Sequence, residues 1–210
     1  PLAAVIGIIA LAGVGVSRVS SDCPPGKQKE FALLCIEDKS RISNGERTFF
    51  PITHNTYRDL GIKAFKQDKY KEAINLFAQA VAANGNDPEV LIYYNNALAR
   101  HMGNPITLAA AVPADNNTNF AQEILRGVAQ AQHQFNGNGG FNARLLEIKI
   151  ANDADQPEQA KQVAAELVKD QSILGVIGHY SSESTKAALE EYNKINIPII
   201  SPSSTSTQLQ

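Results

Sequence analysis

Residues 173–201 are ILGVIGHYSSESTKAALEEYNKINIPIIS, and this stretch decides the fold class. It opens with a short apolar run from Ile173 to Ile177, continues as an amphipathic helical pattern from Ser182 to Asn193, and closes with a second apolar run from Ile197 to Ser201. Short apolar runs bounded by turn residues are typical of buried strands. A strand, a helix and a strand in this order predict a parallel unit with a right-handed crossover.

The same alternation extends upstream of this unit. Residues 106–112 (ITLAAAV) and 143–150 (ARLLEIKI) predict two more strands. Residues 119–135 and 158–169 predict two helices, the second with Pro157 in its first turn. Residues 106–210 therefore predict an α/β fold with a parallel sheet of strand order 2-1-3-4 and helices on both faces.

In residues 54–101 the apolar residues recur at the spacing of amphipathic helices, and Gln67-Asp68-Lys69 is expected to form a tight turn between two of them. A third helix is expected from Glu89 to Arg100, after a turn that ends at Pro88. The spacing resembles a tetratricopeptide repeat at Tyr57, Leu60, Gly61, Tyr70, Ala73, Phe77 and Ala80. Because a stable array needs about three repeats, we expect a short all-α helical-repeat segment that acts as a spacer. A peptide-binding groove is the functional alternative.

The first 17 residues are apolar apart from Ser17, with no charge before Arg18. They predict a membrane anchor or a signal segment, and a buried core helix is the alternative. Residues 18–53 predict a turn-rich linker. Cys23 and Cys35 lie within it, and an even cysteine count beside an export segment predicts a disulfide; two unpaired buried thiols are the alternative.

Composition and motifs exclude several functions. The 210 residues carry a formal net charge of −2 and no basic run, which argues against nucleic-acid binding. Residues 137–140 lack the lysine of a phosphate loop, and the histidines show no metal-ligand spacing, so we expect no cofactor and no metal. His179 and Ser182 are too close in sequence to suggest a nucleophile and its base, and no G-x-S-x-G motif is present, so we expect no enzyme. The start at Pro1 and the abrupt end lead us to expect a fragment of a longer protein.

Polar loops follow three of the predicted strands. They are residues 113–120 (PADNNTNF), 179–185 (HYSSEST) and 201–207 (SPSSTST). Ligands of such sheets bind beyond the carboxyl ends of the strands, where the strand order reverses. Hydroxyls and free helix amides suit a carboxylate, and Ser182, at the start of a predicted helix, can either cap it or face an anion.

Residues 106–209 resemble the start of the type I periplasmic binding proteins, in the branch of ABC transporter substrate-binding proteins that take leucine, isoleucine and valine. The matching stretches are Gly139-Gly140, Asn152 to Pro157, Ile177 to Thr185, and Ile197 to Pro202. The resemblance implies that the chain holds an incomplete first lobe and lacks the second. It implies that Ser182 binds a carboxylate, that Ser203 and Thr205 hold the carboxylate and ammonium, and that Phe120 shields the ligand. The candidate ligand-binding residues are Phe120, Tyr180, Ser181, Ser182, Ser203 and Thr205.

This resemblance also implies a function. We expect an extracytoplasmic solute-binding component of an ABC-type importer, with an amino acid or a related zwitterion as ligand and an ABC transporter permease as partner. It would lie in the periplasm or on the outer face of the cytoplasmic membrane, exported or anchored through its N-terminal segment. The alternative is the ligand-sensing ectodomain of a receptor with an upstream signalling domain.

Overall fold

The computed structural model describes residues 27–30, 34–37, 40–51 and 54–209. The chain divides into two compact units, residues 1–37 and 38–210. In the first unit, β1 (Lys27–Glu30) pairs antiparallel with β2 (Leu34–Glu37). The expected anchor or signal segment and Cys23 of the expected disulfide lie outside the described residues.

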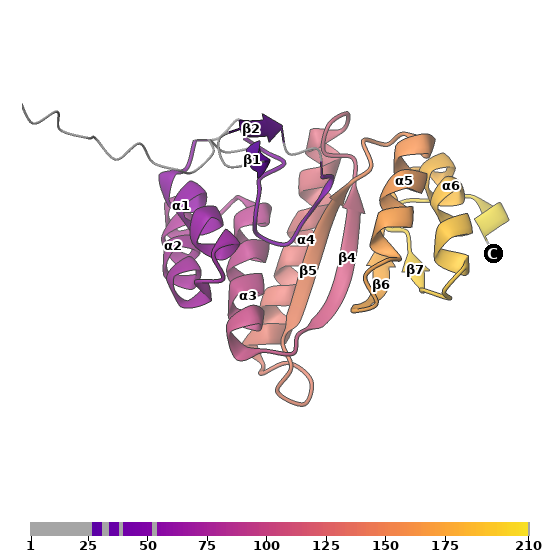
Figure 1. Cartoon of the computed structure of the whole chain (residues 1–210). Coiled ribbons are helices and arrows are strands. Elements are labelled where there is room, and N and C mark those ends of the chain that lie inside the picture. The colour runs from indigo at the N-terminus through magenta and orange to yellow at the C-terminus, as the bar shows by residue number, and fades with distance from the viewer. Residues whose placement is uncertain (1–26, 31–33, 38–39, 52–53, 210) are drawn as a thin grey trace, which may run out of the picture. The chain divides into compact units, whose positions relative to one another are not determined.

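The second unit is an α/β fold (Figure 1). A short strand and three helices come first, followed by alternating strands and helices. The elements are β3 (Ile42–Ser43), α1 (Thr56–Lys66), α2 (Tyr70–Ala83), α3 (Pro88–Met102), β4 (Ile106–Val112), α4 (Thr118–Gly137), β5 (Leu146–Asn152), α5 (Pro157–Leu167), β6 (Ile173–Ile177), α6 (Ser182–Asn193), β7 (Ile199–Ile200) and a 3₁₀ turn, η1 (Thr207–Leu209).

The predicted parallel sheet is confirmed. Its strands lie in the order β3-β5-β4-β6-β7, and the pairs β4–β5, β4–β6 and β6–β7 are all parallel. The predicted order 2-1-3-4 corresponds to β5-β4-β6-β7. The second strand begins at Leu146, three residues later than predicted, because Asn142 and Ala143 have positive φ angles and belong to a turn.

One strand of the sheet was not predicted. β3 pairs antiparallel with β5 at the edge of the sheet, so the sheet is mixed. It lies within residues 18–53, where the sequence predicted a linker. Two residues are too few to show the alternation that identifies a strand, so only the pairing with β5 reveals it.

Helices cover both faces of the sheet, as predicted. Alternate residues of a strand point to opposite faces. Ala110 and Val112 of β4 belong to a hydrophobic cluster with residues of α1 to α4, whereas Ala109 and Ala111 belong to a cluster with residues of α5 and α6. The small alanine side chains let helices approach the central strand from either side.

The N-terminal helices share the first of these two clusters. Gly61 of α1 lies so close to Phe77 of α2 that an added Cβ would come within 2.6 Å of the ring. Phe77 in turn packs against Tyr93 of α3, with ring centroids 5.9 Å apart. α3 therefore belongs to the same core as the sheet.

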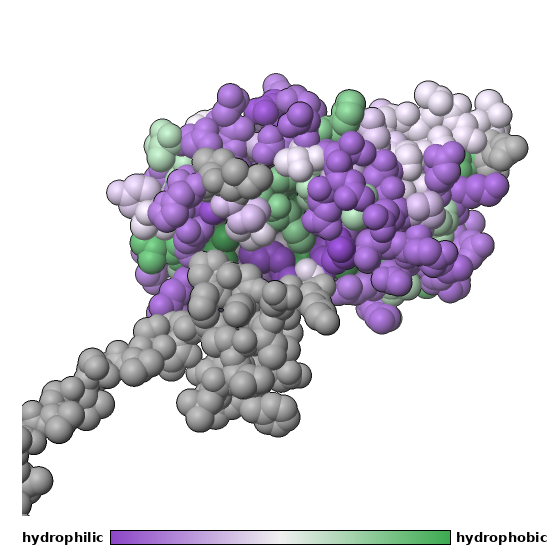
Figure 2. All heavy atoms as spheres, turned by 90° about the horizontal axis from the view of Figure 1, so that it is seen from above, coloured by the Kyte–Doolittle hydropathy of each residue, from purple (hydrophilic) through white to green (hydrophobic). Residues whose placement is uncertain are grey.

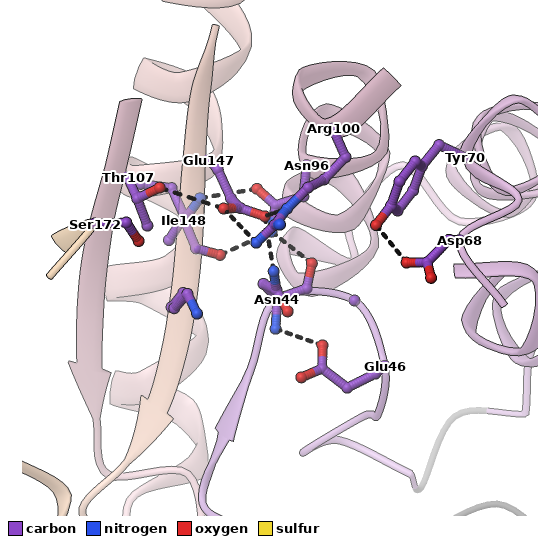
Figure 3. Close-up of polar contacts among 12 residues, drawn as sticks. Asn44, Glu46, Asp68, Tyr70, Asn96, Arg100, Thr107, Glu147, Ile148 and Ser172 are labelled. Atoms are coloured by element: carbon purple, nitrogen blue, oxygen red, sulfur yellow. Dashed lines mark hydrogen bonds and ion pairs between the residues drawn. The ribbon is translucent and has the colours of Figure 1, made fainter. Parts of the chain in front are cut away.

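Polar side chains fix α3 to β5 (Figure 3). The buried Asn96 side chain accepts a hydrogen bond from Ile148 N at 2.8 Å and donates one to Ile148 O at 2.7 Å. Arg100 forms an ion pair with the buried Glu147, and its Nη2 lies 2.9 Å from Oε2 of that residue. These contacts are at the end of β5 that is remote from the polar loops.

Candidate functional site

The three polar loops gather at the carboxyl ends of the parallel strands. β4 and β6 are neighbours, but α4, which follows β4, covers one face of the sheet and α6, which follows β6, covers the other. The strand order thus reverses between them, which is where ligands bind in open α/β sheets. Figure 2 looks down on this side of the molecule, and hydrophilic residues cover much of its coloured surface.

Two aromatic rings from different loops meet at this edge. Phe120, in the first turn of α4, packs against Tyr180, which follows β6, with ring centroids 4.9 Å apart and planes inclined by 31°. Phe120 remains 52% exposed. A partly exposed aromatic pair offers an apolar surface to a ligand side chain. The contact joins two candidate residues that are about 60 positions apart in the sequence.

Serine hydroxyls connect the loop after β6 with the loop after β7. Ser182 Oγ lies 2.8 Å from Ser204 Oγ, and Ser203 Oγ donates to Tyr180 O at 2.6 Å. Ser201 Oγ donates to His179 O at 2.8 Å. We call Tyr180–Ser182 and Ser203–Thr205 together the hydroxyl rim.

The start of α6 differs in one respect from expectation. The N-cap is Ser181, whose side chain accepts from Ser184 N at 3.2 Å. Ser182 is the first helical residue, and its hydroxyl faces Ser204 instead of the helix amides. The sequence left two roles open for Ser182, to cap the helix or to face an anion. The cap is its neighbour Ser181.

Thr205 is exposed and lies in the same loop as Ser203 and Ser204. Ring packing and a hydrogen bond thus link Phe120, Tyr180 and Ser203, and the chain places Ser181, Ser182 and Thr205 beside them. Sequence reasoning missed Ser204, although it belongs to the quoted SPSSTST segment. Nothing local separates it from the neighbouring serines, and only the contact with Ser182 distinguishes it.

Acidic side chains around the rim are held by specific partners. Arg41 Nη1 and Asn152 Nδ2 donate to Asp115 at 2.8 and 2.7 Å. Partial burial opposes ionisation of Asp115, but these hydrogen bonds outweigh it and hold its pKa below the usual value. Asn117 donates to Asp155 at 3.2 Å. The Arg41 ion pair therefore compensates the charge of Asp115.

His179 does not act as a base for the serines. Its ring is fully buried, and both ring nitrogens already have partners, Asp153 on Nδ1 and Tyr192 on Nε2. A nucleophile and its base must lie within hydrogen-bond reach of each other. Within the described ranges, no cluster of three His, Cys, Asp or Glu side chains is arranged to hold a metal ion.

A family model described as periplasmic binding protein matches residues 105–210. The chain belongs to the periplasmic binding protein family. The match begins just before β4, so the helices α1 to α3 precede the part that identifies the family. Among the residues that the structure describes, no helix has both the length and the apolar character required to cross a membrane.

Individual relatives in this family carry names of binding proteins. The chain is 34% identical over 113 residues to the "Amino acid binding protein" of Pseudomonas aeruginosa, covering 53% of this chain and 30% of the relative. It is 33% identical over 119 residues to the "Leu/Ile/Val-binding protein" of Escherichia coli, covering 57% and 31%. The chain thus spans about a third of the length of these relatives.

Among solved structures, a putative branched-chain amino acid ABC transporter protein from Rhodospirillum rubrum is 26% identical, with a TM-score of 0.49 over 50% of this chain and 31% of the other.

Proposed function

We propose that this chain forms part of an extracytoplasmic solute-binding protein of an ABC-type importer, with an amino acid or a related small zwitterion as its ligand. The observation that supports this most directly is the hydroxyl rim at the start of α6, with the Phe120–Tyr180 pair beside it. The names of the relatives, which refer to amino acids, support the ligand class.

The ligand carboxylate would bind at Ser182 and Thr205. The free amides and dipole at the start of α6 favour a nearby anion by about 0.3–1 kcal/mol. A hydrogen bond from a hydroxyl to a charged group adds roughly 1.5–3 kcal/mol. Ser203 would help to hold the carboxylate and ammonium, and Phe120 with Tyr180 would shield the ligand side chain from water.

The partner we propose is an ABC transporter permease, and the location is the periplasm or the outer face of the cytoplasmic membrane. In this proposal the N-terminal segment exports or anchors the protein. Helices α1 to α3, whose spacing resembles a tetratricopeptide repeat, pack in the same hydrophobic cluster as the sheet and would link the N-terminal segment to the binding lobe.

Calorimetric titration of the complete protein tests the proposal. The panel contains leucine, isoleucine, valine and alanine, with glucose as a solute that is not a zwitterion. Ser182→Ala is expected to weaken amino-acid binding about tenfold or more, since each 1.4 kcal/mol is a factor of ten. Ser172→Ala is the matched control, because Ser172 precedes β6 at the opposite end of the strand and bonds only locally to Asp170.

Two outcomes contradict different parts of the proposal. An unchanged affinity in Ser182→Ala rejects the site. Binding of glucose but of no amino acid rejects the ligand class and leaves the family assignment intact.

A further inference from the structure

Three buried polar side chains form a line beneath the hydroxyl rim. Asp153 follows β5, His179 follows β6, and Tyr192 lies on α6. His179 Nδ1 is 2.5 Å from Asp153 Oδ2, and His179 Nε2 is 3.0 Å from the Tyr192 hydroxyl. All three side chains are 0% exposed. Groups buried this completely do not reach a ligand, so any effect on binding must pass through the backbone.

The hydrogen bonds in this line have a definite direction. An ionised carboxylate can only accept, so His179 donates through Nδ1–H to Asp153. With that proton on Nδ1, the lone pair of Nε2 accepts from the Tyr192 hydroxyl. Burial, together with the nearby Asp153 charge, raises the pKa of Tyr192, so this hydroxyl keeps the proton that it donates. Donation from Tyr192 to His179 and from His179 to Asp153 thus gives every group in the line a partner.

The same residues connect the carboxyl ends of four strands. Asp153 N donates to Val112 O at the end of β4, at 3.2 Å, while its side chain holds the loop that follows β6. The carbonyl of His179 accepts from Ser201, which follows β7, at 2.8 Å. His179 is therefore the residue at which the loops of the rim are joined.

The backbone after His179 leads directly into the rim. Tyr180, Ser181 and Ser182 are the next three residues, and Thr185 Oγ1 closes the turn by donating to Ser181 O at 2.7 Å. The hydrogen bonds to Asp153 and Tyr192 hold the His179 side chain and, through its Cα, the carbonyl that accepts from Ser201. The positions of Ser182, Ser203 and the first amides of α6 therefore depend on how firmly these bonds hold His179.

We propose that His179, oriented by Asp153 and Tyr192, is the positioning residue of the ligand-binding rim. It holds the backbone from Tyr180 to Ser182 so that the hydroxyls and the amides of α6 face one anion. The consequence for ligand affinity rests on the function proposed above, whereas the positioning of the loop does not.

The test compares two tyrosine variants of the complete protein. Tyr192→Phe removes the hydroxyl that bonds to His179. Tyr70→Phe is the matched control, because it also removes a hydroxyl bonded to a partner, Asp68 at 2.6 Å, but at the start of α2 and near Arg100 (Figure 3). Amide hydrogen exchange at residues 180–185 and calorimetric titration with L-leucine are measured for each.

Tyr192→Phe is expected to accelerate exchange at residues 180–185 and to weaken leucine binding about three- to tenfold, the loss typical of one hydrogen bond. Tyr70→Phe is expected to change neither quantity. In the wild-type protein, the ¹⁵N chemical shifts of the His179 ring are expected to show a proton on Nδ1 and a free lone pair on Nε2.

Two further variants separate positioning from general stability. In His179→Asn, the side-chain amide lies near the position of Nδ1 and can still donate to Asp153. His179→Leu has no donor at this position. The asparagine variant is expected to retain more of the wild-type affinity and slower exchange at the rim. Equal behaviour of the two variants would count against the proposal.

The positioning role is overturned if Tyr192→Phe and Asp153→Asn both match the wild type in exchange at residues 180–185. It is also overturned if the ring proton is on Nε2. If the wild type binds no leucine but Tyr192→Phe still loosens residues 180–185, the positioning role stands and the proposed function fails.

Discussion

Two adjacent serines at the start of α6 have different roles. Ser181 is the N-cap and accepts from Ser184 N, whereas Ser182 bonds to Ser204. Ser181→Ala is expected to lower the free energy of unfolding by about 1 kcal/mol, the usual loss for a missing cap. Ser182→Ala, which breaks only a partly exposed contact, is expected to change it by less than about 0.5 kcal/mol. Urea unfolding measures both, and an equal loss in the two variants would contradict the assignment of the cap.

Gly178, which links β6 to His179, occupies a position that other residues do not tolerate. Its φ is +132°, and an added Cβ would collide with Ala111 O and lie 2.9 Å from Ala111 Cβ. Gly178→Ala is expected to destabilise the fold by roughly 1–3 kcal/mol. The control is Gly127→Ala in α4, where no neighbouring atom lies within 4 Å of the added Cβ. This substitution is expected to stabilise the fold by about 0.5–1 kcal/mol. In thermal unfolding, Gly178→Ala is expected to lower the melting temperature and Gly127→Ala to raise it.

At the scale of elements, side chains from two helices complete the outer edge of β5. β3 pairs only with residues near Ile150, so Leu146 and Ile148 have backbone groups that β3 does not reach. Asn136 of α4 bonds to both N and O of Leu146, and Asn96 of α3 does the same for Ile148. The amides thus satisfy a strand edge that would otherwise be a template for aggregation.

Asn96→Leu is therefore expected to be costly. It leaves the buried N–H and C=O of Ile148 without these partners, and each unsatisfied group costs about 1–3 kcal/mol. The control is Asn75→Leu at an exposed position of α2, where a change within about 0.5 kcal/mol is expected. Both values come from denaturant unfolding, and similar values for the two variants would show that the amide of Asn96 is not required.

At the scale of the whole molecule, one buried acid makes stability depend on pH. Glu89 of α3 is fully buried and accepts from Thr48 Oγ1 at 2.5 Å, Phe49 N at 2.8 Å and the Tyr93 hydroxyl at 3.1 Å. Burial raises the pKa of Glu89 from 4.5 to about 7 against the opposing effect of these hydrogen bonds. The folded protein therefore holds this proton more tightly than the unfolded chain does.

The pKa of Glu89 is higher in the folded protein than in the unfolded chain. Its contribution to the free energy of unfolding is therefore fully present below about pH 4.5 and is lost as the pH rises through about 7. The free energy of unfolding is expected to fall over this interval by up to roughly 3 kcal/mol. Glu89→Gln is expected to remove most of this slope, and the exposed Glu123→Gln to leave it unchanged. Urea unfolding at several pH values from 4.5 to 8 gives the slope of the free energy of unfolding against pH. If Glu89→Gln kept the wild-type slope, Glu89 would not be its cause.

The sequence by itself determined the order and type of the elements from β4 onward. The predicted ranges 106–112, 173–177 and 182–193 coincide with β4, β6 and α6, and the parallel order of the strands was also correct. Apolar periodicity, short connections and right-handed crossovers are properties of neighbouring residues, so they can be recognised without the fold. The polar loops that gather at one edge follow from the same parallel topology.

The tertiary structure alone decided which polar residues meet. β3 is too short to have a period, and the amides of Asn96 and Asn136 could equally have faced water. His179 offered no signal either, because its partner Asp153 is 26 positions away and belongs to another loop. The physical reason is the same in each case. These groups are paired because burial makes an unpaired polar group costly, and the sequence does not record which distant group will lie beside it.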